Sequence, residues 1–252
     1  SIRKASRSIS IALFTDRHDY VQNNAPDLFD HIFDIESERP RHPRLPFIDK
    51  IRCLRETPFD RTLFLDSDTY VFQGLDDLFR LLERFDVVIT HGHNRRRRSL
   101  AARGRIPDLE GEAPRQRLPD SIPSAFVPMQ GGFLLYNSGA AHVRNWLADV
   151  KRQYVANDFY DDQIAMLMTL WEHPDIRLYC LPEEYNFSGL EAFGRWRRSG
   201  FAIAVPHVLH YTAHKRDPER AIRRMLPHTD ALPAGTFGWS ALARKLRQRL
   251  AF

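Results

Sequence analysis

The sequence lacks long hydrophobic runs and has few cysteines. No apolar stretch approaches the roughly 20 residues that a bilayer-spanning helix needs. The two cysteines, Cys53 and Cys180, lie within apolar segments and are too few for a disulfide-stabilised scaffold. The first residues, Ser1–Arg7, lack the apolar core of a signal peptide. We therefore expect a cytoplasmic protein in a reducing compartment.

The composition is that of an ordinary globular protein. Of the 252 residues, 43% are hydrophobic and 27% are charged, which excludes collagen-like, low-complexity and wholly disordered chains. The length suits one large α/β domain or two small ones, and no linker-like stretch divides the chain. A net charge of +5 favours anionic partners such as nucleic acid, acidic lipid or phosphorylated small molecules, without selecting among them.

Short apolar runs rich in β-branched and aromatic residues alternate with segments of helical periodicity. The runs that predict strands are Ser8–Phe14, His31–Ile35, Thr62–Leu65, Asp86–Thr90, Gly132–Tyr136, Ile176–Leu181 and His207–Tyr211. The segments that predict helices are Phe47–Arg55, Leu75–Phe85, Ala140–Tyr154, Asp161–Trp171, Pro218–Leu226 and Ser240–Leu250. This alternation predicts an α/β fold with a mainly parallel sheet flanked by helices, in a single domain that spans residues 1–252.

Two basic segments interrupt this pattern. Residues 91–123 contain Arg95–Arg98, several prolines and almost no apolar periodicity, so we expect either a solvated loop or a mobile lid over an anionic ligand. Residues 239–252 predict a basic amphipathic helix with Leu242, Leu246 and Leu250 on one face. That helix either packs on the domain or lies on the anionic inner face of a membrane.

The clearest chemical signal is Asp66-Ser67-Asp68, directly after the strand predicted at Thr62–Leu65. In extended backbone, residues two apart point the same way, so two carboxylates meet at the sheet edge where α/β folds bind ligands. Adjacent carboxylates repel unless a cation lies between them, and Mg²⁺ or Mn²⁺ prefers such oxygen ligands. The alternative is a solvated acidic turn without a ligand.

Six segments along the chain, one of which contains this motif, form an ordered set. They are Ile11–Asp16 with Tyr20, Lys50 with Pro58–Thr69, Gln130–Phe133, Asp162-Gln163, Leu181–Asn186 and His210–Lys215. Together they resemble the nucleotide-sugar glycosyltransferases of GT-A fold, especially retaining glycosyltransferase family 8, which includes glycogenin and bacterial lipopolysaccharide galactosyltransferases. Gln130 stands where that family usually has Asn, and Ala213 where it usually has Gly.

The resemblance implies a metal-dependent enzyme that transfers a sugar from a UDP-sugar, with retention, to a glycan or glycolipid acceptor in bacterial surface polysaccharide or glycolipid synthesis. The implied ligands of Mn²⁺ or Mg²⁺ are Asp66, Asp68 and His210. The implied contacts to the donor are Thr15, Asp16, Tyr20, Lys50, Ser67, Gln130, Gly131 and Gly132. The implied catalytic residues are Asp162, Gln163 and Lys215, the first two near the reacting sugar carbon and the last at the leaving diphosphate.

Several of these residues also have plain structural explanations. His210 could be a buried histidine bonded to a backbone carbonyl, and Lys215 could be a surface lysine. Asp158 and Asp161 suit a helix start, where aspartates cap the helix and complement its dipole, and the same explanation is open to Asp162. Only the resemblance favours a catalytic role for Asp162 and Gln163. Gly131-Gly132 could form a β-bulge or could let the sugar approach the backbone.

Other functions fit parts of the sequence. A haloacid-dehalogenase-like phosphatase also places D-x-D after a strand, with Asp66 as nucleophile, but usually at the first strand of the chain. A non-catalytic nucleic-acid-binding protein could use the basic loop, although that loop lacks interleaved aromatic residues. A sugar-nucleotide pyrophosphorylase would need a Gly-rich loop after the first strand, where this chain has Thr15–His18.

Overall fold

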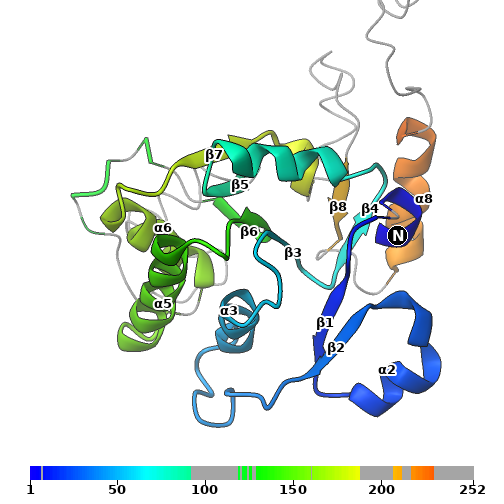
Figure 1. Ribbon diagram of the computed structural model, residues 1–252, viewed down its shortest axis with the longest axis horizontal. Coiled ribbons are helices and arrows are strands. Elements are labelled where there is room, and N and C mark those ends of the chain that lie inside the picture. The colour runs from blue at the N-terminus through cyan, green and yellow to red at the C-terminus, as the bar shows by residue number, and fades with distance from the viewer. Residues whose placement is uncertain are drawn as a thin grey trace, which may run out of the picture.

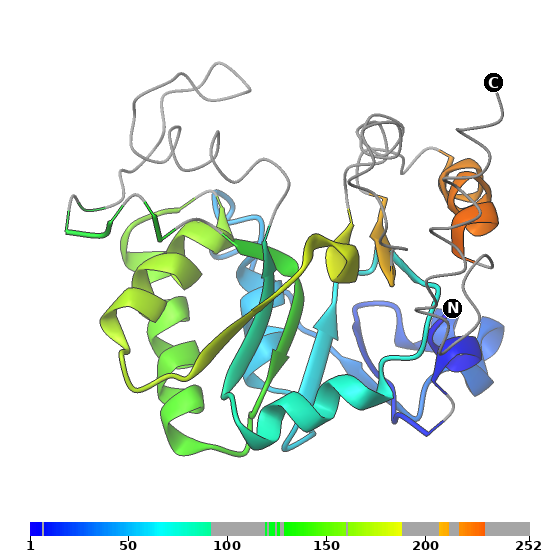
Figure 2. The ribbon, with the colours of Figure 1, turned by 90° about the horizontal axis from the view of Figure 1, so that it is seen from above.

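Helices cover both faces of a central four-stranded sheet in the computed structural model of this chain (Figures 1 and 2). The structure describes residues 1–6, 8–91, 119, 121–123, 125–126, 129–159, 161–187, 207–211 and 217–229. Most of the loop predicted at 91–123, Lys215 and the helix predicted at 239–252 lie outside these residues. Among the described helices, none is both long and apolar enough to span a membrane.

Strands and helices alternate as the sequence predicts. The strands are β1 (Ala12–Thr15), β2 (His31–Asp34), β3 (Thr62–Leu65), β4 (Thr69–Val71), β5 (Val87–His91), β6 (Met129–Tyr136), β7 (Leu178–Leu181) and β8 (Val208–His210). The α-helices are α1 (Ile2–Ala5), α2 (His18–Asn24), α3 (Ile48–Arg55), α5 (Ala141–Ala156), α6 (Asp162–Glu172) and α8 (Pro218–Thr229). The 3₁₀ helices are η1 (Pro26–Leu28), η2 (Asp76–Glu83) and η3 (Glu183–Asn186).

The differences from the predicted elements are local. The first strand begins at Ala12 rather than at Ser8, and the helix predicted at Leu75–Phe85 is the 3₁₀ helix η2. Three further elements, α1, α2 and the three-residue strand β4, are not predicted by the sequence pattern. These elements are short, so neither helical nor strand periodicity has room to develop in them.

The central sheet has the strand order β3-β6-β5-β7. β6 is antiparallel to both β3 and β5, and β7 is parallel to β5. Three of the four strands therefore share one direction, as a mainly parallel sheet requires, and β6 alone runs against them. The sequence does not reveal this reversal because β6 is buried at every position, and a strand covered on both faces has the same apolar pattern in either direction. Two smaller sheets, β1-β2 and β4-β8, complete the described part of the fold.

Alternate residues of the central strands face two separate cores. Val87 and Leu134 pack with α3, α5 and α6 in the larger core, around the fully buried Trp146. Val88 and Phe133 face the opposite side, where η2 covers the sheet. Figure 2 shows the sheet between these two layers. The period of two along each strand thus places one helical layer on each face.

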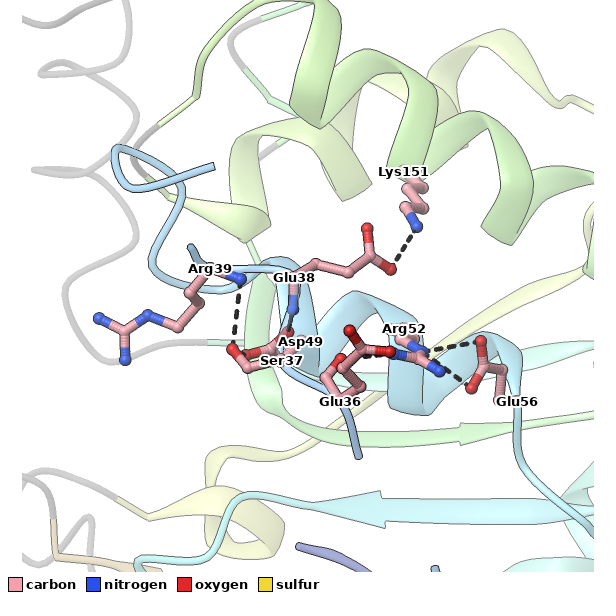
Figure 3. Close-up of polar contacts among 8 residues, drawn as sticks. All are labelled: Glu36, Ser37, Glu38, Arg39, Asp49, Arg52, Glu56 and Lys151. Carbon is pink, nitrogen blue, oxygen red and sulfur yellow. Dashed lines mark hydrogen bonds and ion pairs between the residues drawn. The ribbon is translucent and has the colours of Figure 1, made fainter. Parts of the chain in front are cut away.

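Polar contacts fix the loop between β2 and α3 (Figure 3). The residues in this network are Glu36, Ser37, Glu38, Arg39, Asp49, Arg52, Glu56 and Lys151. Asp49, in the first turn of α3, accepts hydrogen bonds from Ser37 Oγ at 2.6 Å and from Glu38 N at 2.7 Å. Lys151 on α5 pairs with the Glu38 carboxylate at 2.6 Å. The loop is therefore tied to two helices, which fixes the N-terminal end of α3.

Candidate metal centre and donor site

Three side chains of types that can bind a metal ion meet just after β3. Asp66 and Asp68 lie in the turn between β3 and β4, and Asp66 N donates a hydrogen bond to Gly132 O on β6 at 3.0 Å. The Thr69 hydroxyl donates to Asp66 O at 2.8 Å and closes the turn. β4 pairs antiparallel with β8, with Thr69 opposite His210. The pairing of these two short strands therefore brings His210 to the acidic turn.

The ligand atoms of Asp66, Asp68 and His210 all lie within 4.8 Å of one another. His210 Nε2 lies 3.0 Å from Asp68 Oδ1 and 3.6 Å from Asp66 Oδ2. Burial raises the pKa of Asp66, against the opposing effects of Lys50 and His210, so a further positive charge would stabilise its ionised form. Two carboxylates and one imidazole, on one side of a turn, suit a Mn²⁺ or Mg²⁺ ion that keeps positions open for phosphate oxygens.

Two glycines of β6 make room for this cluster. A Cβ at Gly132 would lie 2.6 Å from His210 Cε1 and 2.8 Å from Asp66 Oδ2, so only glycine fits there without displacement. A Cβ at Gly131 would lie 3.1 Å from Asp162 Oδ2. The register of β6 against β5 also shifts at this point, because Ile89 pairs with Leu134 whereas the next residue, Thr90, pairs with Gln130. The irregular register supports the β-bulge explanation of the glycine pair, and the chain's own side chains also approach the two glycines closely. The approach of a sugar to this backbone stays a prediction.

Lys50 links the metal ligands to the start of α6. Its Nζ lies 3.1 Å from Asp66 Oδ1 and 3.0 Å from Asp162 Oδ2. Burial opposes the charged ammonium, but the carboxylates of Asp162 and Asp66 outweigh it and raise the pKa of Lys50. Lys50 is therefore a permanent positive charge between two acidic groups that come from different elements.

The structure gives different roles to the two aspartates at the start of α6. Asp161 is the N-cap residue, and its side chain accepts a hydrogen bond from Gln163 N at 2.9 Å. Asp162 is only 1% exposed and faces Lys50. The capping explanation therefore holds for Asp161, whereas Asp162 belongs to the charged cluster.

Solved structures of glycosyltransferases match most of this chain. The galactosyltransferase LgtC, in complex with donor and acceptor sugar analogues, shares 16% sequence identity; the match covers 95% of this chain and 92% of LgtC, with a TM-score of 0.59. Mouse xyloside xylosyltransferase 1, in its apo form, shares 13% identity over 84% of this chain and 88% of its own, with a TM-score of 0.51. The chain has the GT-A fold. No protein-family model and no curated protein matches the sequence, so membership of family 8 stays a prediction.

Within this GT-A fold, the predicted donor contacts lie in three places. Gln130, Gly131 and Gly132 lie together on β6. Ser67 joins Lys50 and Asp66 in the lining of a largely apolar cavity of about 730 Å³, which β1 and β3 also line. Thr15 and Asp16 lie at the end of β1, and Tyr20, on α2, is 64% exposed.

No hydrogen bond or ion pair between described residues joins Thr15, Asp16 or Tyr20 to the metal cluster. The structure thus brings together the candidate metal ligands, Lys50, Asp162 and the two glycines. The donor contacts expected at Thr15, Asp16 and Tyr20 stay predictions. Lys215 lies outside the described residues.

Sequence reasoning missed one residue of the site. Thr69 closes the acidic turn through its hydroxyl. Its position directly after Asp68 could have indicated this role, because Thr hydroxyls often bond backbone groups in turns. Asn186 was recognised as part of a segment but received no role, although it is buried beside the strand that carries His210.

Proposed function

We propose that this chain is a metal-dependent glycosyltransferase that transfers a sugar from a UDP-sugar to a glycan or glycolipid acceptor, with retention of configuration. The observation that carries the proposal is the meeting of Asp66, Asp68 and His210 at the end of β3 in a GT-A fold. Known proteins of this fold that match the chain include a galactosyltransferase and a xylosyltransferase. The biological role that we propose is the synthesis of a bacterial surface polysaccharide or glycolipid.

Asp66, Asp68 and His210 would hold a Mn²⁺ or Mg²⁺ ion. When bound, the ion supplies positive charge to the donor diphosphate, on which negative charge grows as the sugar–phosphate bond breaks. Lys215 would add a second positive charge at the same group.

Lys50 would hold the carboxylates of Asp66 and Asp162 in place before the substrates arrive. Its ammonium lies within 3.1 Å of both groups, and a buried carboxylate without such a partner would be strongly destabilising. We assign Asp162 and Gln163 to the side of the site that faces the reacting sugar carbon. Gly131 would contribute backbone to this side of the site, where it lies next to Asp162 and Gln163.

The remaining donor contacts would hold the nucleotide. Ser67 lies between the two aspartates of the acidic turn, and Gln130 directly precedes the two glycines on β6. Thr15, Asp16 and Tyr20 would contact the base, and the segment 239–252 would provide a peripheral contact with an anionic membrane.

The fold argues against the phosphatase alternative. In this chain β1 and β2 precede the acidic turn, and Asp66 lies at the end of β3 with Lys50 and His210 around it. The nucleic-acid alternative depends on a loop outside the described residues, and it is separated from our proposal by the experiment below.

Calorimetric titration of UDP, with and without Mn²⁺, tests the proposed function. We expect UDP binding that depends on Mn²⁺, and Mn²⁺-dependent hydrolysis of one donor in a panel of nucleotide sugars without acceptor. The anomeric configuration of the released sugar, followed by NMR, tests retention. Binding of nucleic acid but not of UDP would contradict the proposal.

A matched pair of variants locates the binding site. Asp68→Ala should abolish Mn²⁺-dependent binding of UDP, whereas Asp77→Ala, which removes an exposed carboxylate from η2, should leave binding unchanged. Unchanged affinity in Asp68→Ala would overturn the assignment of the metal ligands.

A further inference from the structure

Helix α3, which carries Lys50, has no cap of its own at its N-terminal end. The N-cap residue is Phe47, and its side chain makes no capping hydrogen bond. In a capping box, the side chain of the third helical residue accepts a hydrogen bond from the N–H of the N-cap residue. The third residue of α3 is Lys50, which can only donate, and its ammonium is paired with Asp66 and Asp162. The N–H of Phe47 therefore needs an acceptor from another element.

Tyr154 on α5 supplies this acceptor. Its hydroxyl oxygen accepts a hydrogen bond from Phe47 N at 3.0 Å, although the two residues are 107 positions apart in the sequence. Tyr154 is fully buried in the core that α3 and α5 share. Burial raises the pKa of its hydroxyl, and the carboxylates of Asp162 and Asp161 act in the same direction. The hydroxyl therefore stays neutral and lies within electrostatic reach of the charged cluster.

The same face of α5 also holds the loop that leads into α3. Lys151 lies three residues before Tyr154, and residues at this spacing are neighbours on one face of a helix. Lys151 pairs with Glu38 at 2.6 Å, and Glu38 N donates to Asp49 Oδ1 in the first turn of α3 at 2.7 Å (Figure 3). α5 therefore holds the turn that carries Lys50 by two separate contacts.

We propose that Tyr154 is a positioning residue whose hydroxyl sets the first turn of α3 and thereby places the Lys50 ammonium between Asp66 and Asp162; its part in the reaction rests on the proposed function. Lys50 is the third residue of the helix, so a shift of the first turn moves its backbone directly. Its Nζ contacts two carboxylates from different elements at 3.1 and 3.0 Å, and such short contacts tolerate little displacement. A cation in the first turn also opposes the helix dipole, so the turn does not favour this position by itself.

Tyr136 provides a matched control at the other end of α3. It is also fully buried, and its hydroxyl donates to Leu54 O at 2.7 Å, near the C-terminal end of the helix. Tyr154→Phe and Tyr136→Phe therefore each remove one buried hydroxyl from the backbone of the same helix. Both variants should lose stability, but only Tyr154→Phe should disturb Lys50.

Chemical denaturation of the whole chain without metal tests the placement of Lys50. Each tyrosine variant is measured alone and together with Lys50→Met. The loss of stability caused by Tyr154→Phe should be smaller in the presence of Lys50→Met, because no ammonium is left to misplace, whereas the loss caused by Tyr136→Phe should be the same in both backgrounds. An equal loss from Tyr154→Phe in both backgrounds would overturn the inference.

The part of Tyr154 in the reaction is measured by Mn²⁺-dependent hydrolysis of the donor. Tyr154→Phe should lower kcat by about 10-fold with little change in KM, because a displaced Lys50 no longer holds Asp162 at the reacting side of the site. Tyr136→Phe should leave kcat close to that of the wild type. The same kcat in both tyrosine variants would exclude a part for Tyr154 in the reaction.

The outcomes separate this inference from the proposed function. If the wild type neither binds UDP nor hydrolyses a donor, the proposed function fails, and the stability measurements alone decide whether Tyr154 places Lys50. Should Lys50→Met fail to fold, crystal structures of the two tyrosine variants decide instead. A distance from Lys50 Nζ to Asp162 that lengthens in Tyr154→Phe but not in Tyr136→Phe would support the inference, and an unchanged distance in Tyr154→Phe would overturn it.

Discussion

Replacing Gly132 by alanine tests how closely the metal ligands pack against β6. The added Cβ would lie 2.6 Å from Cε1 and 2.8 Å from Nδ1 of His210, and 2.8 Å from Oδ2 of Asp66. All three distances are well inside van der Waals contact, so the ring and the carboxylate must both move. The φ angle of Gly132 is not in the left-handed region, so the effect is steric and not one of backbone strain.

The magnitude follows from what must move. Gly132→Ala shifts two of the three metal ligands, so we expect Mn²⁺ affinity to fall by about 10–100-fold, as when the support of a ligand is lost. Overpacking should also lower the free energy of unfolding by about 1–3 kcal/mol. Calorimetric titration with Mn²⁺ measures the first quantity, and chemical denaturation without metal measures the second.

Two other glycines provide the controls for this prediction. A Cβ at Gly139 would meet Asp60 at 3.2 Å, so Gly139→Ala should affect stability but not Mn²⁺ affinity. Gly131→Ala would meet Asp162 and Lys50 at 3.1 and 3.3 Å, and it should weaken Mn²⁺ binding less than Gly132→Ala does. A folded Gly132→Ala protein that binds Mn²⁺ as the wild type does would refute the arrangement of ligands described here.

Three further predictions concern charged groups. Lys50→Met should lower the free energy of unfolding by about 3–5 kcal/mol in chemical denaturation without metal, because the buried carboxylate of Asp162 and the partly buried carboxylate of Asp66 lose their partner. Added Mn²⁺ should restore part of the loss, and full stability without metal would contradict the pairing. The Arg177 side chain donates hydrogen bonds to Asp86 and lowers the pKa of the Asp86 carboxyl to about 2. The pairing therefore stabilises the folded state fully above about pH 4, and this contribution is lost as the pH falls towards 2. Asp86→Asn should lower the free energy of unfolding by about 1–2 kcal/mol at pH 7, and it should reduce the loss of stability as the pH falls from about 4 towards 2, measured by chemical denaturation. An unchanged pH dependence would contradict the pairing of Asp86 with Arg177. Lys215→Ala should lower kcat by about 10²-fold with a smaller change in KM for the donor, and normal turnover would exclude its role at the leaving group.

The strands that frame the site could be predicted because their burial is visible in the sequence. Thr62–Leu65 is a short apolar run that ends at two aspartates, and the structure has β3 at those four residues. The first turn of α6 was recognised from its aspartates, since capping follows local chemistry. Local patterns therefore fixed where the acidic turn and the helix begin.

The contacts that complete the site depend on pairings that no local pattern encodes. His210 and Asp68 are 142 residues apart, and they meet because two three-residue strands, β4 and β8, pair. Lys50 was expected to contact the donor, but its pairing with Asp162 arises from the packing of α3 and α6 on the same face of the sheet. The direction of β6 could not be predicted either, because β6 is buried on both faces and its continuous apolar run suits parallel and antiparallel pairing equally.

The charges gathered at the site argue for a cation independently of the fold. Lys50 pairs with the carboxylates of Asp66 and Asp162, and the ligand atoms of Asp66, Asp68 and His210 lie within 4.8 Å of one another. A divalent ion between Asp66 and Asp68 would offset the repulsion between their two carboxylates. Burial raises the pKa of Asp66 even with Lys50 beside it, so a nearby cation would stabilise the ionised form of this carboxyl group. Mn²⁺ should therefore raise the melting temperature without any nucleotide, and it should do so through Asp68. If Asp68→Ala and the wild type show the same increase, the ion binds elsewhere on the chain.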